Sequence, residues 1–156
     1  MAKDLYIARL KAVPLFGGMS KKELDLMVRQ ADHLRYPARY TVVREGTPGE
    51  EFWLVVEGEL AVQRGERTVA TLGPGDSFGE LAVIDPAPRD ATIVSTSPVE
   101  LMVIGRRRFW ATLEDSHTLM RKVIVGLAQR LRAADQADSA RREGTVDITD
   151  KAATKA

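Results

Sequence analysis

Two short segments decide how the sequence is interpreted: FGELA at residues 78–82 and PRDAT at residues 88–92. Gly79 lets the backbone approach a ligand closely, and a short helix that begins there would aim free N–H groups outward, as helix N-termini do when they bind anions. Arg89 offers a planar fork of donors to two phosphate oxygens, while an ionised Glu80 can accept a hydrogen bond from a sugar hydroxyl. The segments therefore predict a site for an anion that also presents a ribose hydroxyl, which describes a nucleotide.

Short apolar runs surround these segments between residues 33 and 104. The runs are rich in Val, Leu, Thr and aromatic residues, and they cover residues 40–44, 52–56, 60–64 and 68–72. Turn sequences separate the runs regularly, for example at Glu57-Gly58, Arg64-Gly65 and Gly73-Pro74-Gly75-Asp76. Many short strands with regular turns predict a β-sandwich or jelly roll, whose interior can shelter one small ligand.

Helical spacing of apolar residues precedes and follows these strands. Residues 2–30 predict two short helices, the second opened by a capping box from Ser20 to Glu23. After the strands, the pattern predicts a helix over residues 106–113 and then an amphipathic helix of about four turns. The apolar stripe of this last helix consists of Leu119, Met120, Val123, Ile124, Leu127 and Leu131. The predicted fold class is mainly β with flanking helices: a jelly roll with N-terminal helices and two C-terminal helices.

The composition divides the chain near residue 134. Residues 1–134 are predicted to form a single domain, because 156 residues suit one substantial core. Residues 135–156 are nearly free of large apolar side chains, so we expect a disordered polar tail that cannot form a helix-turn-helix. The helix around residues 118–132 is a candidate surface for a second copy of the chain or for a protein partner.

Charge and composition exclude several other classes of protein. Lys and Arg number 23 against 22 Asp and Glu, so no global basic field attracts nucleic acid or an anionic membrane. The absence of cysteine excludes disulfides, thiolate metal sites and cysteine nucleophiles. The two histidines, His33 and His117, have no acid at ligand spacing, so neither a metal site nor a cupin-type enzyme is expected. No signal sequence or membrane span is evident, and we expect a cytoplasmic protein that is not an enzyme.

The string over residues 78–92 resembles the phosphate-binding cassette of cyclic-nucleotide-binding domains, as in catabolite-activator-type regulators and the regulatory subunits of cyclic-AMP-dependent kinase. The resemblance spans roughly residues 10–131 and includes the turns at Gly46 and Gly58. It implies that Glu80 and the Gly79 backbone hold the ribose 2′-hydroxyl and that Arg89 pairs with the cyclic phosphate. Backbone N–H groups would complete the phosphate cradle, so that the implied ligand-binding residues are Gly79, Glu80, Leu81, Ala82, Arg89, Asp90 and Ala91.

The resemblance also implies a function. The expected ligand is cyclic AMP, with cyclic GMP as the other candidate, and no cofactor, metal or catalytic residue is expected. Binding would reposition the C-terminal helix if apolar residues such as Leu127 or Leu131 reach the base. The alternative is a vestigial fold that no longer binds nucleotide and serves as a protein-interaction module.

Two residues depart from the family pattern. Arg39 stands where the family usually has glycine, so the turn there is expected to differ locally. Asp90 follows the phosphate-binding arginine, where the family commonly has Ala, Ser or Thr. A carboxylate that pointed inward at this position would repel the phosphate, so the direction of the Asp90 side chain matters for affinity.

Overall fold

The computed structural model describes residues 2–153, and it describes the side chains of residues 2–142. The chain begins with α1 (Ala2–Lys11), the 3-10 turn η1 (Pro14–Phe16) and α2 (Lys21–Gln30). Ten strands follow within the described residues: β1 (Asp32–Tyr36), β2 (Thr41–Val43), β3 (Pro48–Gly49), β4 (Glu51–Glu57), β5 (Leu60–Arg64), β6 (Arg67–Leu72), β7 (Ser77–Phe78), β8 (Ala87–Pro88), β9 (Thr92–Ser95) and β10 (Val99–Gly105). Helix α3 (Glu80–Ile84) lies between β7 and β8, and α4 (Arg106–Glu114) and α5 (His117–Ala153) close the chain.

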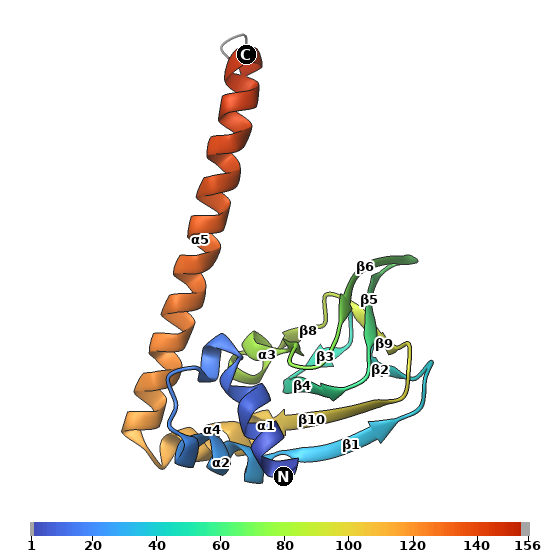
Figure 1. Cartoon of the computed structure of the whole chain (residues 1–156), viewed down its shortest axis with the longest axis vertical. Coiled ribbons are helices and arrows are strands. Elements are labelled where there is room, and N and C mark those ends of the chain that lie inside the picture. Colours follow the sequence, from blue (N-terminus) through green and yellow to red (C-terminus); the bar gives the residue numbers. More distant parts are fainter. Residues whose placement is uncertain (1, 154–156) are drawn as a thin grey trace.

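The strands form two four-stranded sheets and one short pair. The first sheet has the order β1-β10-β4-β7, the second has the order β2-β9-β5-β6, and β3 pairs with β8. Every pairing is antiparallel. Figure 1 shows the strands curled into a roll with α1, α2 and α4 at one side. The predicted fold class, a mainly β jelly roll with flanking helices, is confirmed.

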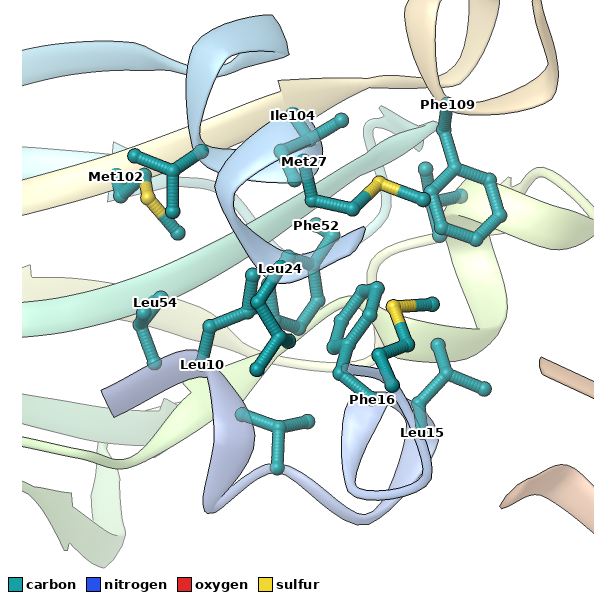
Figure 2. Packing of buried hydrophobic residues seen from close by; sticks show 14 of the residues in the cluster. Leu10, Leu15, Phe16, Leu24, Met27, Phe52, Leu54, Met102, Ile104 and Phe109 are labelled. Carbon is teal, nitrogen blue, oxygen red and sulfur yellow. The ribbon is translucent and has the colours of Figure 1, made fainter. Parts of the chain in front are cut away.

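Strand β4 lies at the centre of the core because both of its faces are covered. Successive side chains of a strand point to opposite faces, so Phe52 and Leu54 pack against the helices while Trp53 and Val55 face the interior of the roll. The ring of Phe16 meets that of Phe52 edge-on, with centroids 5.1 Å apart (Figure 2). Burial of one such phenylalanine contributes about 1.5–3 kcal/mol, so this contact fixes the N-terminal segment on the sheet.

The predicted capping box at the start of α2 is confirmed. The Ser20 Oγ accepts a hydrogen bond from the Glu23 N–H at 3.2 Å, and the Ser20 N–H donates to Glu23 Oε1 at 2.9 Å. The Glu23 carboxylate also accepts a hydrogen bond from Lys122 Nζ of α5 at 2.5 Å. One carboxylate therefore caps α2 and ties it to the C-terminal helix.

Helix α5 is longer than the sequence predicts. It has 37 residues and continues to Ala153, past the boundary near residue 134 at which the composition predicted the start of a disordered tail (Figure 1). Beyond that boundary, Asp138 pairs with Arg142 at 2.7 Å, one helical turn away. Ala, Arg and Glu favour a helix even where no core covers them, and such pairs add to that preference. No helix in the described part of the chain has the length and apolar character needed to cross a membrane.

The apolar stripe of α5 is buried only in part. Leu119 and Val123 are almost completely buried against the N-terminal helices, whereas Ile124 and Leu131 are 60% and 63% exposed. Gly126 lies on the packed side, where a Cβ would come within 2.8 Å of the Leu15 carbonyl oxygen. The missing side chain lets α5 pack closely on η1.

The turn at Arg39 has the backbone conformation that glycine normally adopts. Arg39 itself has a φ of 65°, in the left-handed region that side chains other than glycine rarely adopt. Its N–H donates to the Ser95 carbonyl at 2.8 Å, which holds the turn against β9. A tertiary hydrogen bond therefore maintains at Arg39 a backbone conformation that usually requires glycine, and a turn that differs from the family's stays a prediction.

Candidate functional site

Gly79 sets the geometry at the junction of β7 and α3. Its φ is 83°, and a Cβ at this position would lie 2.2 Å from the carbonyl oxygen of Glu51. Both facts require glycine, because a side chain would be strained and would collide with β4. The chain then enters α3, whose first N–H groups have no partner within the helix and can therefore bind an anion.

The β3–β8 pair places Arg89 close to this junction. Pro48 pairs with Pro88, and the Arg89 N–H donates to the Thr47 carbonyl at 2.8 Å. The Arg89 carbonyl in turn accepts from the Gly46 N–H at 2.7 Å. The backbone of Arg89 is thus held on both sides before its side chain makes any contact.

The guanidinium of Arg89 is buried in the roll. Its side chain is only 8% exposed, and its Nη2 donates to the Glu51 carbonyl oxygen at 3.3 Å. Burial lowers the pKa of Arg89, while the nearby carboxylates of Glu51 and Asp90 act in the opposite direction. An arginine stays protonated in proteins, so the site holds a buried cation whose donors are only partly used.

Glu80 lies at the start of α3 and is oriented by its neighbour in β7. The Ser77 hydroxyl donates to Glu80 Oε1 at 2.5 Å. A carboxylate has room for several hydrogen bonds, so Glu80 can still accept one from a ligand hydroxyl.

The Asp90 side chain lies largely in solvent, although its charge still acts on Arg89. The Asp90 side chain is 87% exposed, and its Oδ2 lies 3.4 Å from Nη2 of Arg64, which is itself 60% exposed. The family departure at this position therefore places its charge at the surface, where water and salt screen it. Ala91, the next residue, is buried in the roll.

One open cavity of about 390 Å³ brings the predicted site together. It is lined by all of the predicted residues, namely Gly79, Glu80, Leu81, Ala82, Arg89, Asp90 and Ala91. Val43, Val62, Leu72, Phe78 and Ile93 add an apolar wall. The volume falls within the usual range for small-ligand sites, and the combination of one buried cation with an apolar wall suits a ligand that has an anionic end and a flat base.

Sequence reasoning missed several residues around this cavity. Glu51 and Gly49 contact Arg89, and Arg64 pairs with Asp90, but each lies in a strand far from the cassette in sequence. Arg130 of α5 also lines the cavity. Neither Leu127 nor Leu131 does so in this structure, because Leu127 packs against the helices and Leu131 is exposed. The signal that could have pointed to Gly49 and Glu51 is the Gly49-Glu50-Glu51 sequence between β3 and β4, an acidic pair after a glycine.

The described residues do not assemble a metal centre, since no three acidic or histidine side chains among them come together as ligands.

Comparison with known proteins identifies the family to which this sequence is related. Residues 33–116 match the family model described as "Cyclic nucleotide-binding domain". The chain is 32% identical over 131 residues to the cyclic AMP receptor protein of Thermus thermophilus, covering 81% of this chain and 61% of that protein. It is 37% identical over 122 residues to the cAMP-dependent protein kinase regulatory subunit of Aspergillus niger, covering 77% of this chain and 30% of that protein.

A solved structure agrees with this relationship. The structure of a cyclic nucleotide-binding domain from Methylobacillus flagellatus superposes with a TM-score of 0.75 at 26% identity, covering 89% of this chain and 81% of that one. The chain spans less than two thirds of the two curated relatives, so it corresponds to one part of those proteins. Because the family model covers more than half of the sequence and the fold agrees, this chain belongs to the cyclic nucleotide-binding domain family.

Proposed function

We propose that this domain is a non-enzymatic sensor that binds cyclic AMP in the cavity between α3 and β8. The observation that carries the proposal is the buried guanidinium of Arg89, which lines the same cavity as Glu80 and the start of α3. Arg89 would bind the cyclic phosphate, together with the backbone N–H groups of Ala82, Asp90 and Ala91. Glu80 would accept a hydrogen bond from the ribose 2′-hydroxyl, and the base would lie on the apolar wall.

The names of the curated relatives support cyclic AMP in preference to cyclic GMP, since both are named for cyclic AMP. The cavity itself supports a purine nucleotide in general, because its apolar wall offers contact area without a fixed pattern of donors. The affinity for each nucleotide therefore has to be measured.

The decisive experiment is isothermal titration of the wild type and of Arg89→Ala with cyclic AMP and cyclic GMP. Loss of a charge-assisted bidentate contact costs roughly 2–4 kcal/mol, so Arg89→Ala should weaken binding thirtyfold to a thousandfold. Arg35→Ala is the matched control, because its side chain is 84% exposed and pairs with Glu100 at the surface. Unaltered binding by Arg89→Ala would remove this residue from the site.

We further propose that α5 carries the output signal. The helix packs on η1 through Gly126, and its Arg130 lines the nucleotide cavity. A ligand can shift the helix only if its contacts differ between the free and bound arrangements, and Arg130 is the α5 residue placed to make such a contact.

This movement can be measured directly because the sequence contains no cysteine. Spin labels on Asp135→Cys in α5 and Glu57→Cys in β4 would report the distance between helix and roll. A control pair on Glu57→Cys and Arg35→Cys lies within the roll. Cyclic AMP should change the first distance distribution and leave the second unaltered, and two unaltered distributions would refute the output role of α5.

The alternative is a domain that has lost nucleotide binding and acts through its C-terminal helix. The exposed apolar side chains of Ile124, Val125 and Leu131 favour it. The same titration distinguishes the two functions, because a vestigial domain gives no binding heat with either nucleotide.

A further inference from the structure

Glu51, at the first position of β4, presents two oxygen atoms to Arg89. Its carbonyl oxygen accepts a hydrogen bond from Arg89 Nη2 at 3.3 Å, and its carboxylate Oε1 lies 3.8 Å from the same nitrogen. The carbonyl contact belongs to the backbone and persists whatever side chain stands at residue 51. The carboxylate contact depends on the side chain alone and can be removed by substitution.

Arg89 has little freedom to change partners by moving. Its backbone is held by Thr47 and Gly46, and its side chain lies directly against Gly49. The Glu51 side chain, by contrast, is 38% exposed. The same Oε1 also accepts a long hydrogen bond of 3.4 Å from the Glu50 N–H. A half-exposed carboxylate can exchange these two contacts for water, whereas the buried guanidinium cannot.

The other acidic groups near Arg89 do not perform the same role. Asp90 points outward and pairs with Arg64, and Glu80 accepts a hydrogen bond from Ser77. Glu50, next to Glu51, is exposed and makes no ion pair with Arg89 in the described structure. Among the described residues, Glu51 is therefore the carboxylate that forms an ion pair with Arg89, and Asp90 acts on the same cation only as the smaller of the two charges.

We propose that Glu51 is the counter-ion of Arg89 in the nucleotide-free domain, and that the phosphate of the incoming nucleotide must displace its carboxylate. This inference rests on the proposed function and adds a residue that sets affinity. In the free domain the carboxylate stabilises a buried positive charge. In the bound domain it lies close to a second anion and opposes binding, so its net effect is to weaken the affinity for nucleotide.

The first test compares Glu51→Gln with Glu50→Gln in isothermal titrations with cyclic AMP at low and high salt. Each variant removes one negative charge from the same end of β4, but only Glu51 contacts Arg89. Glu51→Gln should bind about three- to tenfold more tightly than the wild type, and high salt should reduce this advantage. Glu50→Gln should stay within twofold of the wild type.

Each outcome of this titration has a definite meaning. Equal affinities of Glu51→Gln and the wild type, or equal gains in both variants, would overturn the inference while leaving the proposed function intact. Absence of binding heat in all three proteins would overturn the proposed function, and the displacement step with it.

The second test needs no nucleotide. Urea unfolding of the wild type, Glu51→Gln, Arg89→Gln and the double variant forms a double-mutant cycle. We expect Glu51→Gln to lower the denaturation midpoint in the presence of Arg89 and to lower it less in the Arg89→Gln background. Equal shifts in the two backgrounds would show that the pair makes no contribution, and would overturn the counter-ion role.

Discussion

Gly49 lies directly against the side chain of Arg89: a Cβ on Gly49 would be 2.2 Å from Arg89 Nε and 2.6 Å from both Cδ and Cζ. The two residues meet because β3 pairs with β8, which places Gly49 opposite Ala87. Glycine at residue 49 is therefore a condition for the buried position of the guanidinium.

Gly49→Ala should weaken cyclic AMP binding at least tenfold. The new methyl group occupies the space of Arg89, so the guanidinium must leave the position from which it would contact a phosphate. Isothermal titration measures the loss. Gly18→Ala serves as the control because a Cβ there meets nothing within 4 Å, and wild-type affinity in Gly49→Ala would show that Arg89 can bind from another position.

Asp90→Ala should leave the affinity for cyclic AMP within about threefold of the wild type. The carboxylate is 87% exposed and paired with Arg64, so solvent and salt screen it from the phosphate site. Titrations at two salt concentrations test this expectation. A tenfold gain in affinity at low salt that shrinks at high salt would mean that the charge turns inward when nucleotide binds.

Acid should weaken the ion pair between Glu23 of α2 and Lys122 of α5. Burial raises the pKa of Glu23, but hydrogen bonds from Lys122 and Ser20 outweigh it, and the net pKa lies below its ordinary value of 4.5. When folding lowers the pKa of a carboxyl, the group stabilises the folded protein at every pH above its pKa in the unfolded chain. This contribution is lost as the pH falls through the pKa of the group in the folded protein.

Glu23→Gln should therefore be less stable than the wild type at pH 7, and the difference should shrink as the pH falls below 4.5. Urea unfolding across this pH range gives the two free energies. Glu114→Gln, at an exposed position of α4, controls for the general loss of negative charge. A constant difference at every pH would contradict an ionic origin.

Gly126→Ala should destabilise the domain by about 1–3 kcal/mol, the usual cost of overpacking. In an exposed helix the same change is favourable by about 1 kcal/mol, because alanine has the higher helix propensity. Here the Cβ would lie 2.8 Å from the Leu15 carbonyl oxygen and 3.0 Å from that of Pro14, so α5 would have to move away from η1. Urea unfolding measures the free energy of unfolding of each variant, with Gln129→Ala as a control at an exposed position of the same helix. A Gly126→Ala variant more stable than the wild type would show that α5 and η1 are not closely packed at this position.

Local sequence patterns were sufficient for much of the fold. The short apolar runs at residues 40–44, 52–56, 60–64 and 68–72 correspond to β2, β4, β5 and β6. Ser20 with Glu23 predicted the start of α2, because these signals depend on residues only a few positions apart. The segments at residues 78–82 and 88–92 predicted residues that line one cavity, although their role in binding stays a prediction.

Composition was a poorer guide to the C-terminal region. It identified the lack of apolar side chains after residue 134, yet α5 continues to Ala153 because helix propensity and pairs such as Asp138–Arg142 do not require a core. The predicted apolar stripe of α5 includes Val123, which is buried, and Ile124, which is exposed. Helical spacing predicts which residues share a face, but it does not predict how much of that face packs against the rest of the domain.

By itself, the sequence determined the mainly β fold class and the capped α2, since their patterns are local, and its resemblance to a family implied the jelly roll and the cassette residues. Only the tertiary structure placed Gly49 and Glu51 against Arg89, turned Asp90 towards Arg64, and brought Arg130 to the cavity. Arg89 and Glu51 are 38 positions apart in the chain. Their contact depends on how β3 pairs with β8 and where β4 lies beside them, and long-range pairing of this kind is fixed by the packing of the whole roll rather than by the residues of either segment.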